Sequence, residues 1–297
     1  SKGPDGTTGT NPVGNGHCAL NPATLEEKKK ALTPAAVKKK VAVIGGGIGG
    51  MEAARVAALR GHSVTLYEKS GELGGVFIAA AAPSFKEKDK MLIAWYIRQL
   101  EKLKVDIRLD SEITPENLSS LDADEIIIAT GAKCRSLRAD GADRENVMNA
   151  VEYLRGYKET GENVVIVGGG LTGCEIAYDA VLKGKKPVIV ELMDDILNVP
   201  NLCAANSNML REILRYYRIP VYTQTKTTAI TDAGVEIEGP EGKKTLPADS
   251  VVTSIGYIPG SGLAEKDGKN IHIIGDAARV GNLMNAIWQA YDVARAI

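Results

Sequence analysis

Glycines recur in the same GxGxxG spacing at two places in this chain. The first set lies in VAVIGGGIGGMEAARVAALRGHSVTLYEK and the second in VVIVGGGLTGCEIAYDAVLKGKKPVIVEL, 123 residues further on. The two sets are Gly45, Gly47 and Gly50, and Gly168, Gly170 and Gly173. Between a strand and a helix, the first glycine permits a tight turn, the second lets the backbone approach a pyrophosphate, and the third allows close packing. Each turn is therefore expected to bind a dinucleotide at the N-terminus of the helix that follows.

A carboxylate follows each glycine turn at the same distance. Glu68 and Glu191 both stand at the predicted end of the next strand, where a carboxylate accepts hydrogen bonds from the ribose hydroxyls of an adenosine. A single GxGxxG also occurs in ordinary strand-turn-helix units that bind no nucleotide. Because the strand, the glycines, the small helix residue and the acid all repeat together, the sequence predicts two dinucleotides.

The chain has few other residues that could do chemistry. It contains four cysteines and three histidines, with no CxxC pair and no spacing typical of a metal site or a nucleophile-histidine-acid set. Cys174, in the first turn of the second helix, is expected to be a packed side chain and not a redox thiol. The chemistry is therefore expected to depend on cofactors.

Composition excludes several classes of function. The 297 residues, 44% of them hydrophobic, are enough for two domains, and a formal net charge of -1 leaves no basic excess for binding nucleic acid. No apolar stretch approaches the roughly 20 residues that span a bilayer, and the N-terminus lacks the apolar core of a signal peptide. We expect no membrane association and a cytoplasmic location.

The pattern of elements predicts an α/β fold. Buried strands are expected at 125–129 and 251–256, an amphipathic helix at 88–103, and a second helix near 206–217. The run IIIATG, ending at Gly131, and the run VVTSIG, ending at Gly256, are similar. We predict two Rossmann-like, three-layer dinucleotide-binding domains, the second inserted in the first.

Three parts follow from this pattern. Residues 1–39 form an extended arm with a linker helix beginning near Leu25, residues 40–155 and 254–297 form the first nucleotide domain, and residues 156–253 form the second. The Gly-Asp turn at Gly275 and Asp276 is the best indication that the C-terminal segment completes the first domain.

At this point the motifs resemble a known family. The LGG run that ends at Gly74 and Gly75, the ATG run and the terminal IIGDA resemble the two-dinucleotide flavoproteins of glutathione-reductase topology. Within that superfamily, CALNP and GNLMNAIWQAYDVARAI resemble the C-terminal half of the iron-sulfur Old Yellow Enzyme relatives. Those relatives are the 2,4-dienoyl-CoA reductases, the enoate reductases and trimethylamine dehydrogenase.

The resemblance assigns roles to individual residues. It implies FAD at the first turn, with Asp276 accepting a hydrogen bond and the helix near Met284 or Asn285 directing its N-terminus at the flavin. It implies NADH at the second turn, with Glu175 near the nicotinamide as the candidate catalytic residue. The implied FAD-binding residues are Gly45, Gly47, Gly50, Glu68, Gly74, Gly75, Gly131, Gly275, Asp276 and Asn285. The implied NADH-binding residues are Gly168, Gly170, Gly173 and Glu191, and Gly256 is a further cofactor-binding candidate.

The chain departs from the family pattern in two respects. The resemblance implies an FMN-bearing TIM barrel and a [4Fe-4S] cluster, but here Cys18 matches only the fourth cluster ligand, and a stray loop cysteine is the alternative. The CxxxxC pair of the disulfide reductases is absent, so no dithiol relay is expected. The barrel is then expected in a partner domain or subunit, and the sequence also allows a homo-oligomer.

The sequence thus predicts an NADH:flavin oxidoreductase module of an enoate or dienoyl-CoA reductase-like enzyme. It would pass hydride from NADH to FAD and electrons onward to an iron-sulfur and FMN partner. NADH is expected over NADPH because no arginine stands in the four residues after Glu191. The alternative is a structural module that binds ADP without redox work, as in trimethylamine dehydrogenase.

Overall fold

The chain folds into two compact units in this computed structural model, which describes residues 16–198, 202–260, 262–263 and 270–297. The first unit contains residues 1–81, 87–133 and 258–297, and the second contains residues 82–86 and 134–257. The second unit is therefore inserted in the first. The chain passes between them on either side of the segment 82–86 and again in β5 (Ala132–Cys134) and β14 (Tyr257–Pro259), which pair with each other.

The first unit is built around a five-stranded parallel sheet in the order β15-β4-β1-β2-β3. Its strands are β1 (Lys40–Ile44), β2 (Ser63–Tyr67), β3 (Asp106–Arg108), β4 (Glu125–Ile128) and β15 (Ile271–Ile273). Its helices are α1 (Ile48–Leu59), α2 (Val76–Ala80), α3 (Glu87–Lys102), α4 (Pro115–Leu118), the 3-10 turn η2 (Gly275–Ala277) and α8 (Leu283–Ala296).

Alternation along β1 divides the core of this unit between the two faces of the sheet. Val41 and Val43 pack with α1 and α8, which lie side by side, whereas Ile44 packs with Leu118 of α4 on the other face. Because β15 pairs with β4 and α8 covers α1, the C-terminal segment completes this unit, as predicted.

The second unit is built around a parallel sheet in the order β6-β13-β7-β8-β9. Its strands are β6 (Val147–Asn149), β7 (Asn163–Val167), β8 (Lys186–Val190), β9 (Val221–Tyr222), β10 (Lys226–Thr231), β11 (Gly234–Gly239), β12 (Gly242–Leu246) and β13 (Ser250–Thr253). Its helices are α5 (Ala150–Arg155), α6 (Leu171–Leu182) and α7 (Ala204–Tyr216).

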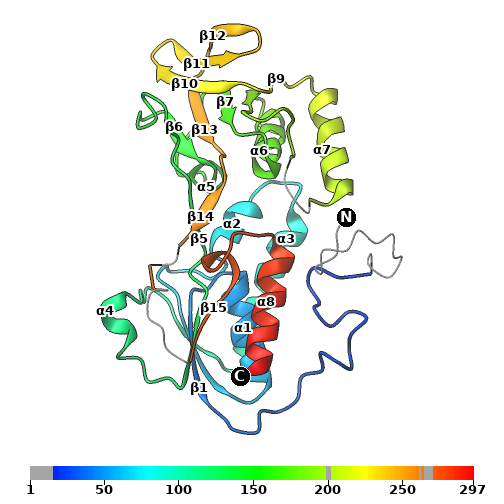
Figure 1. Cartoon of the computed structure of the whole chain (residues 1–297), viewed down its shortest axis with the longest axis vertical. Helices are drawn as coiled ribbons and strands as arrows, with labels where there is room; N and C mark the ends of the chain where they lie inside the picture. The colour runs from blue at the N-terminus through cyan, green and yellow to red at the C-terminus, as the bar shows by residue number, and fades with distance from the viewer. Residues whose placement is uncertain (1–15, 199–201, 261, 264–269) are drawn as a thin grey trace. The chain divides into compact units, whose positions relative to one another are not determined.

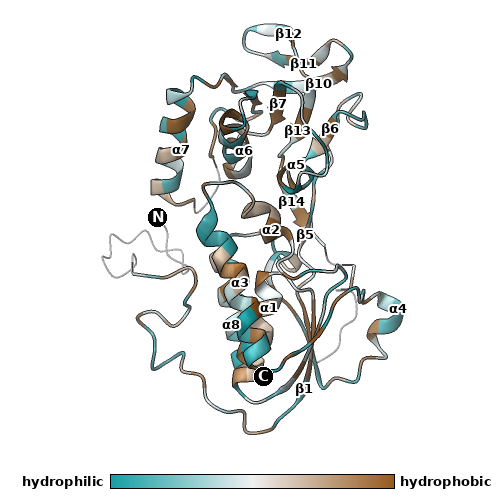
Figure 2. Ribbon diagram, turned by 180° about the vertical axis from the view of Figure 1, so that it is seen from behind, coloured by the Kyte–Doolittle hydropathy of each residue, from teal (hydrophilic) through white to brown (hydrophobic). Residues whose placement is uncertain are grey.

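Different layers cover the two faces of this second sheet. Val164 and Ile166 pack against α5, α6 and α7, while Val165 and Val167 pack against the antiparallel sheet formed by β10, β11 and β12. Helix α7 is coloured in alternating brown and teal in Figure 2, as expected for a helix with one apolar face. Each unit therefore has the three layers that the sequence predicts.

Two predicted boundaries are wrong. Residues 134–155, which we assigned to the first domain, belong to the second unit because β6 pairs with β13 and Tyr153 of α5 packs in its core. The linker helix expected near Leu25 is absent from residues 16–39, where the described backbone forms only turns. Leu25 itself has a φ of +65°, which ends any helix there.

Candidate functional site

The three glycines of the first turn have different surroundings. A Cβ on Gly45 (φ +106°) would collide with the carbonyl of Ala129, and a Cβ on Gly50 would collide with the carbonyl of Gly45. A Cβ on Gly47, the N-cap of α1, would have no protein atom within 4 Å. Gly45 and Gly50 are therefore needed by the fold, whereas Gly47 opens onto free space at a helix N-terminus, where a pyrophosphate fits.

Glu68 is fixed beside this turn. The residue is 7% exposed, and its carboxylate accepts hydrogen bonds from the amide of Gly46 at 2.7 Å and from both the amide and the hydroxyl of Ser70 at 2.8 Å. The glycine-rich loop also closes on the turn, because the amide of Gly74 donates to the carbonyl of Gly46 at 2.9 Å. With three of its about four lone-pair sites occupied, the carboxylate retains room to accept one ribose hydroxyl.

The Gly-Asp turn lies beside the start of α8. Oδ1 of Asp276 accepts a hydrogen bond from the amide of Gly281 at 2.9 Å, and burial raises the pKa of this carboxyl. The amide of Gly275 (φ +61°) donates to Oε1 of Gln289 at 2.8 Å, a contact that the sequence did not reveal. The turn is thus held by a side chain of the same helix that follows it.

Helix α8 begins one or two residues earlier than predicted. The helix begins at Leu283, and Asn282 is its N-cap. Oδ1 of Asn285 accepts from the amide of Asn282 at 3.1 Å, and Oδ1 of Asn282 accepts from the amide of Asn285 at 2.9 Å. The side-chain oxygen of Asn282 therefore caps the helix, and Asn285 completes the capping box from the third helical position.

The second turn repeats the first in detail. A Cβ on Gly168 (φ +110°) would collide with the carbonyl of Ser254, and a Cβ on Gly173 would collide with the carbonyl of Gly168. Glu191 accepts from the amide of Gly169 at 2.5 Å and from that of Met193 at 2.8 Å. Gly170 is the N-cap of α6, as Gly47 is of α1. The structure thus brings the second set of glycines and its carboxylate together in the same arrangement as the first.

The glycines after the two central strands both turn the chain. Gly131 (φ +73°) and Gly256 (φ +92°) lie in the left-handed region, which favours glycine. A Cβ on Gly131 would have no protein atom within 4 Å, and one on Gly256 would meet only the side chain of Arg135. Each therefore leaves open space after its strand.

Glu175, in α6, is paired with a residue that the sequence did not indicate. Its Oε2 lies 2.7 Å from Nζ of Lys86, and the two side chains are 16% and 18% exposed. Lys86 belongs to the short segment 82–86 of the second unit, 89 residues earlier in the chain. The pair is partly shielded from water, so each charge is stabilised by the other.

Helix α7 contributes an arginine to the loop after Glu191. Arg211 binds both carboxylate oxygens of Asp195 at 2.8 Å and the carbonyl of Ile196 at 2.6 Å. The hydrogen bond from Arg211 lowers the pKa of Asp195. A cavity of about 380 Å³ adjoins the pair, and its lining includes Arg215 and Arg218.

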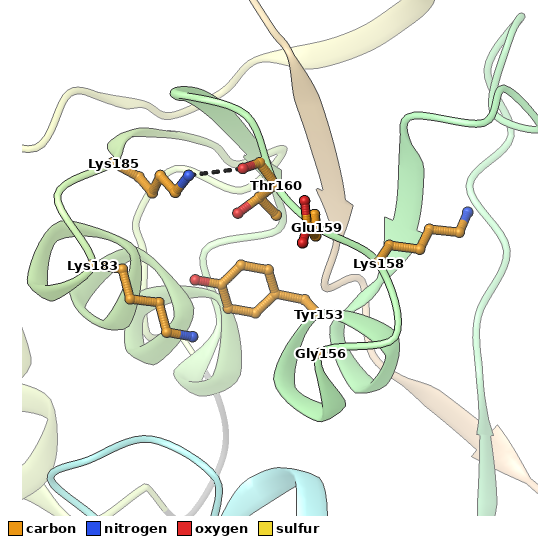
Figure 3. Close-up of a pocket in the computed structure, with 7 residues that line it drawn as sticks. All are labelled: Tyr153, Gly156, Lys158, Glu159, Thr160, Lys183 and Lys185. Carbon is orange, nitrogen blue, oxygen red and sulfur yellow. Dashed lines mark hydrogen bonds between the residues drawn. The ribbon is translucent and has the colours of Figure 1, made fainter.

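A second cavity in this unit, of about 320 Å³, has three lysines among its lining residues (Figure 3). Lys185 donates to the carbonyl of Thr160 at 2.8 Å, Lys183 pairs with Asp179 at 2.6 Å, and Lys158 donates to the carbonyl of Val147 at 2.9 Å. Because these charges are occupied, the cavity offers no anion site comparable to the glycine turns.

The cysteines Cys174 and Cys18 have different surroundings. Cys174 is buried, and its thiol donates to the carbonyl of Gly169 at 3.3 Å, so the prediction of a packed side chain is confirmed. Cys18 is exposed, and its carbonyl accepts from the indole of Trp288 at 3.1 Å. Among the described residues no group of three or more histidine, cysteine or acidic side chains could hold a metal ion. An iron-sulfur cluster therefore does not fit the part of the chain that the structure describes.

Comparison with known proteins places this geometry in a family. The profile of the pyridine nucleotide-disulphide oxidoreductase family matches residues 39–295. The chain is 43% identical over 284 residues to cinnamate reductase of Clostridium sporogenes, covering 94% of this chain and 42% of that protein. It is 37% identical over 287 residues to NADH oxidase of Thermoanaerobacter brockii, covering 93% and 44%.

A solved structure shows the same arrangement. The 2-naphthoyl-CoA reductase complex superposes with a TM-score of 0.88 at 31% identity, covering 94% of this chain and 43% of that one. The chain spans less than half the length of each of these relatives. In the part of the chain that the structure describes, no helix is long and apolar enough to cross a membrane.

Proposed function

The chain belongs to the pyridine nucleotide-disulphide oxidoreductase family, and from this premise we propose that it is an FAD-dependent NADH oxidoreductase module, with FAD bound in its first unit and NADH in its second. The relatives confirm the resemblance to the enoate reductases among the Old Yellow Enzyme relatives. Bound in the first unit, FAD would supply a flavin ring that accepts hydride from reduced nicotinamide.

One observation carries the proposal. Each unit has a glycine as the N-cap of the helix that follows its turn, and each has a carboxylate bound to the turn by one backbone amide, Gly46 to Glu68 and Gly169 to Glu191. A strand-turn-helix unit with only a structural role would need no carboxylate beside its turn. Here the carboxylate is present in both units. The repeat supports two adenosine-containing ligands.

The first unit also has features suited to a flavin. Asp276 supplies a partly buried acceptor, and the N-terminus of α8 carries the positive end of the helix dipole, which favours negative charge nearby. Together with Gly131 and the loop at Gly74 and Gly75, these residues would bind and orient FAD.

In the second unit the chain orients the nicotinamide nucleotide. Glu191 would accept the ribose hydroxyls, and it disfavours a 2′-phosphate because two negative charges about 4 Å apart repel by about 4 kcal/mol at an effective dielectric of 20. The pair of Glu175 and Lys86 would place a carboxylate near the donor ring. NADH is therefore preferred over NADPH.

Electrons leave through a partner. The relatives are more than twice as long as the matched region, and we propose that a domain or subunit outside this chain carries the FMN and the site for the final substrate, an enoate or enoyl thioester. Cys18 would supply at most one ligand to a cluster completed by that partner.

The purified chain tests the proposal directly. It should retain FAD after gel filtration, show flavin absorption that NADH bleaches under anaerobic conditions, and pass electrons from NADH to ferricyanide. The matched comparison is Gly170→Val, which should keep the flavin but lose bleaching by NADH. Retention of ADP alone, with no flavin spectrum after incubation with excess FAD, would instead indicate a structural nucleotide module.

A further inference from the structure

The loop after Glu191 folds back over the second glycine turn. The amide of Leu197 donates to the carbonyl of Gly169 at 2.8 Å, while the amide of Gly169 donates to Glu191 at 2.5 Å. A Cβ on Gly169 would lie 2.7 Å from the Ile196 side chain and 3.3 Å from Oε2 of Glu191. The side chain of Ile196 and the carboxylate of Glu191 therefore both lie against Gly169.

Arg211 reaches this place from α7. Its guanidinium donates to the carbonyl of Ile196 at 2.6 Å. Arg211 therefore binds the residue whose side chain lies beside Glu191. The thiol of Cys174 donates to the carbonyl of Gly169 at 3.3 Å, so it lies beside the same turn. An arginine in this neighbourhood is the usual means of accepting a 2′-phosphate.

Asp195 occupies that arginine. Each of its carboxylate oxygens accepts from a different terminal nitrogen of Arg211 at 2.8 Å, the bidentate geometry that phosphate would otherwise adopt. The pair borders the cavity of about 380 Å³, into which Arg215 and Arg218 also contribute. The described residues give neither of these two arginines an ion-pair partner.

We infer that Asp195 is a specificity-determining residue, which excludes NADPH by holding Arg211 in a bidentate ion pair beside the ribose site. This inference rests on the proposed binding of NADH to the second unit. NADPH is then disfavoured twice, once by repulsion from Glu191 and once because the nearby cation is already neutralised. Removing the Asp195 charge should release Arg211 to meet a 2′-phosphate.

The test compares Asp195→Asn with Asp195→Asn combined with Arg211→Ala, and with the neighbouring Asp194→Asn as the matched control. The probes are 5′-AMP and 2′,5′-ADP, titrated calorimetrically into the full chain, together with kcat/KM for NADH and NADPH. We expect Asp195→Asn to tighten 2′,5′-ADP about tenfold, the effect of one added charge-assisted hydrogen bond, and to leave 5′-AMP unchanged. The gain should disappear in the double variant and be absent from Asp194→Asn.

The outcomes separate the two proposals. If the unaltered chain binds 5′-AMP but Asp195→Asn gains nothing for 2′,5′-ADP, or the gain survives removal of Arg211, the role of Asp195 is wrong and the NADH site stands. If the unaltered chain binds neither 5′-AMP nor NADH, the NADH site and this inference both fall. Should Asp195→Asn lower the melting temperature sharply, Asp195→Ser provides the second removal of the same charge, with the same expected result.

Discussion

Glu175 and Glu52 occupy equivalent positions in the two glycine turns but have different partners. Glu52 is 1% exposed and is bound twice by Arg55 of its own helix, at 2.7 and 2.9 Å. Glu175 pairs instead with Lys86, which is distant in sequence. The two glutamates therefore share a position in the repeat but have different partners.

The first prediction concerns the pair of Glu175 and Lys86. Hydride loss makes the nicotinamide ring positive, so a carboxylate near the ring stabilises the transition state. Glu175→Gln should lower the limiting rate of FAD reduction by NADH by about tenfold, measured by anaerobic stopped flow, with FAD content unchanged. Lys86→Met should instead lower the melting temperature by a few degrees, because a shielded carboxylate loses its cation. An unaltered rate in Glu175→Gln would show that Glu175 takes no part in hydride transfer.

Local sequence patterns predicted the glycine turns, their carboxylates and the Gly-Asp turn. The glycine spacing, the two carboxylates and the Gly-Asp turn depend on nearby residues, so the sequence located them. Lys86, Arg211 and Gln289 reach their partners through the tertiary fold and carry no spacing signal.

The same distinction explains the errors in the fold. Residues 134–155 were misassigned because the pairing of β6 with β13 joins strands about a hundred residues apart in sequence. The amphipathic helix expected at 88–103 is present, but its pattern indicated a buried stripe of Met91, Leu92, Trp95, Ile97 and Leu100 that is only partly correct. Met91 and Trp95 are exposed, while Tyr96 and Leu100 are buried.

Thiol reactivity gives the second prediction. Burial raises the pKa of Cys174 to about 12, so only about one molecule in ten thousand carries the thiolate at pH 8. Iodoacetamide should label the exposed Cys18 and Cys203 in the native chain and leave Cys174 unmodified, as read by peptide mass spectrometry. Labelling in guanidinium chloride, where every thiol should react, is the control. Modification of Cys174 at the same rate as Cys18 in the folded chain would contradict its packing.

The third prediction is a pH dependence of stability. Burial raises the pKa of Asp276 in the folded chain above its unfolded value, so the folded state binds that proton more tightly. Ionisation of this carboxyl therefore lowers the free energy of unfolding, and the loss appears as pH rises through the raised pKa. Asp276→Asn keeps an oxygen for the Gly281 amide without the charge. In the FAD-free chain it should raise the melting temperature by a few degrees at pH 8, with the gap closing as pH falls toward the unfolded pKa. A gap that widens on acidification would reverse the sign of this argument.

The fourth prediction separates glycines that the fold needs from the glycine that the ligand needs. Gly47 has an ordinary negative φ and no protein atom within 4 Å of an added Cβ, so Gly47→Val should leave the melting temperature of the FAD-free chain nearly unchanged. The same side chain would occupy the space where a pyrophosphate approaches, and FAD retention should be lost.

Gly50→Ala is the opposite case. Its added methyl group would collide with the carbonyl of Gly45, so the helix and strand must separate and the variant should unfold at a lower temperature, with or without FAD. Thermal unfolding of both variants, with and without excess FAD, distinguishes the two effects. Excess FAD should raise the melting temperature of the unaltered chain, because ligand bound only to the folded state stabilises it, and should not raise that of Gly47→Val. If FAD stabilised Gly47→Val as strongly as the unaltered chain, the pyrophosphate would not lie at this turn.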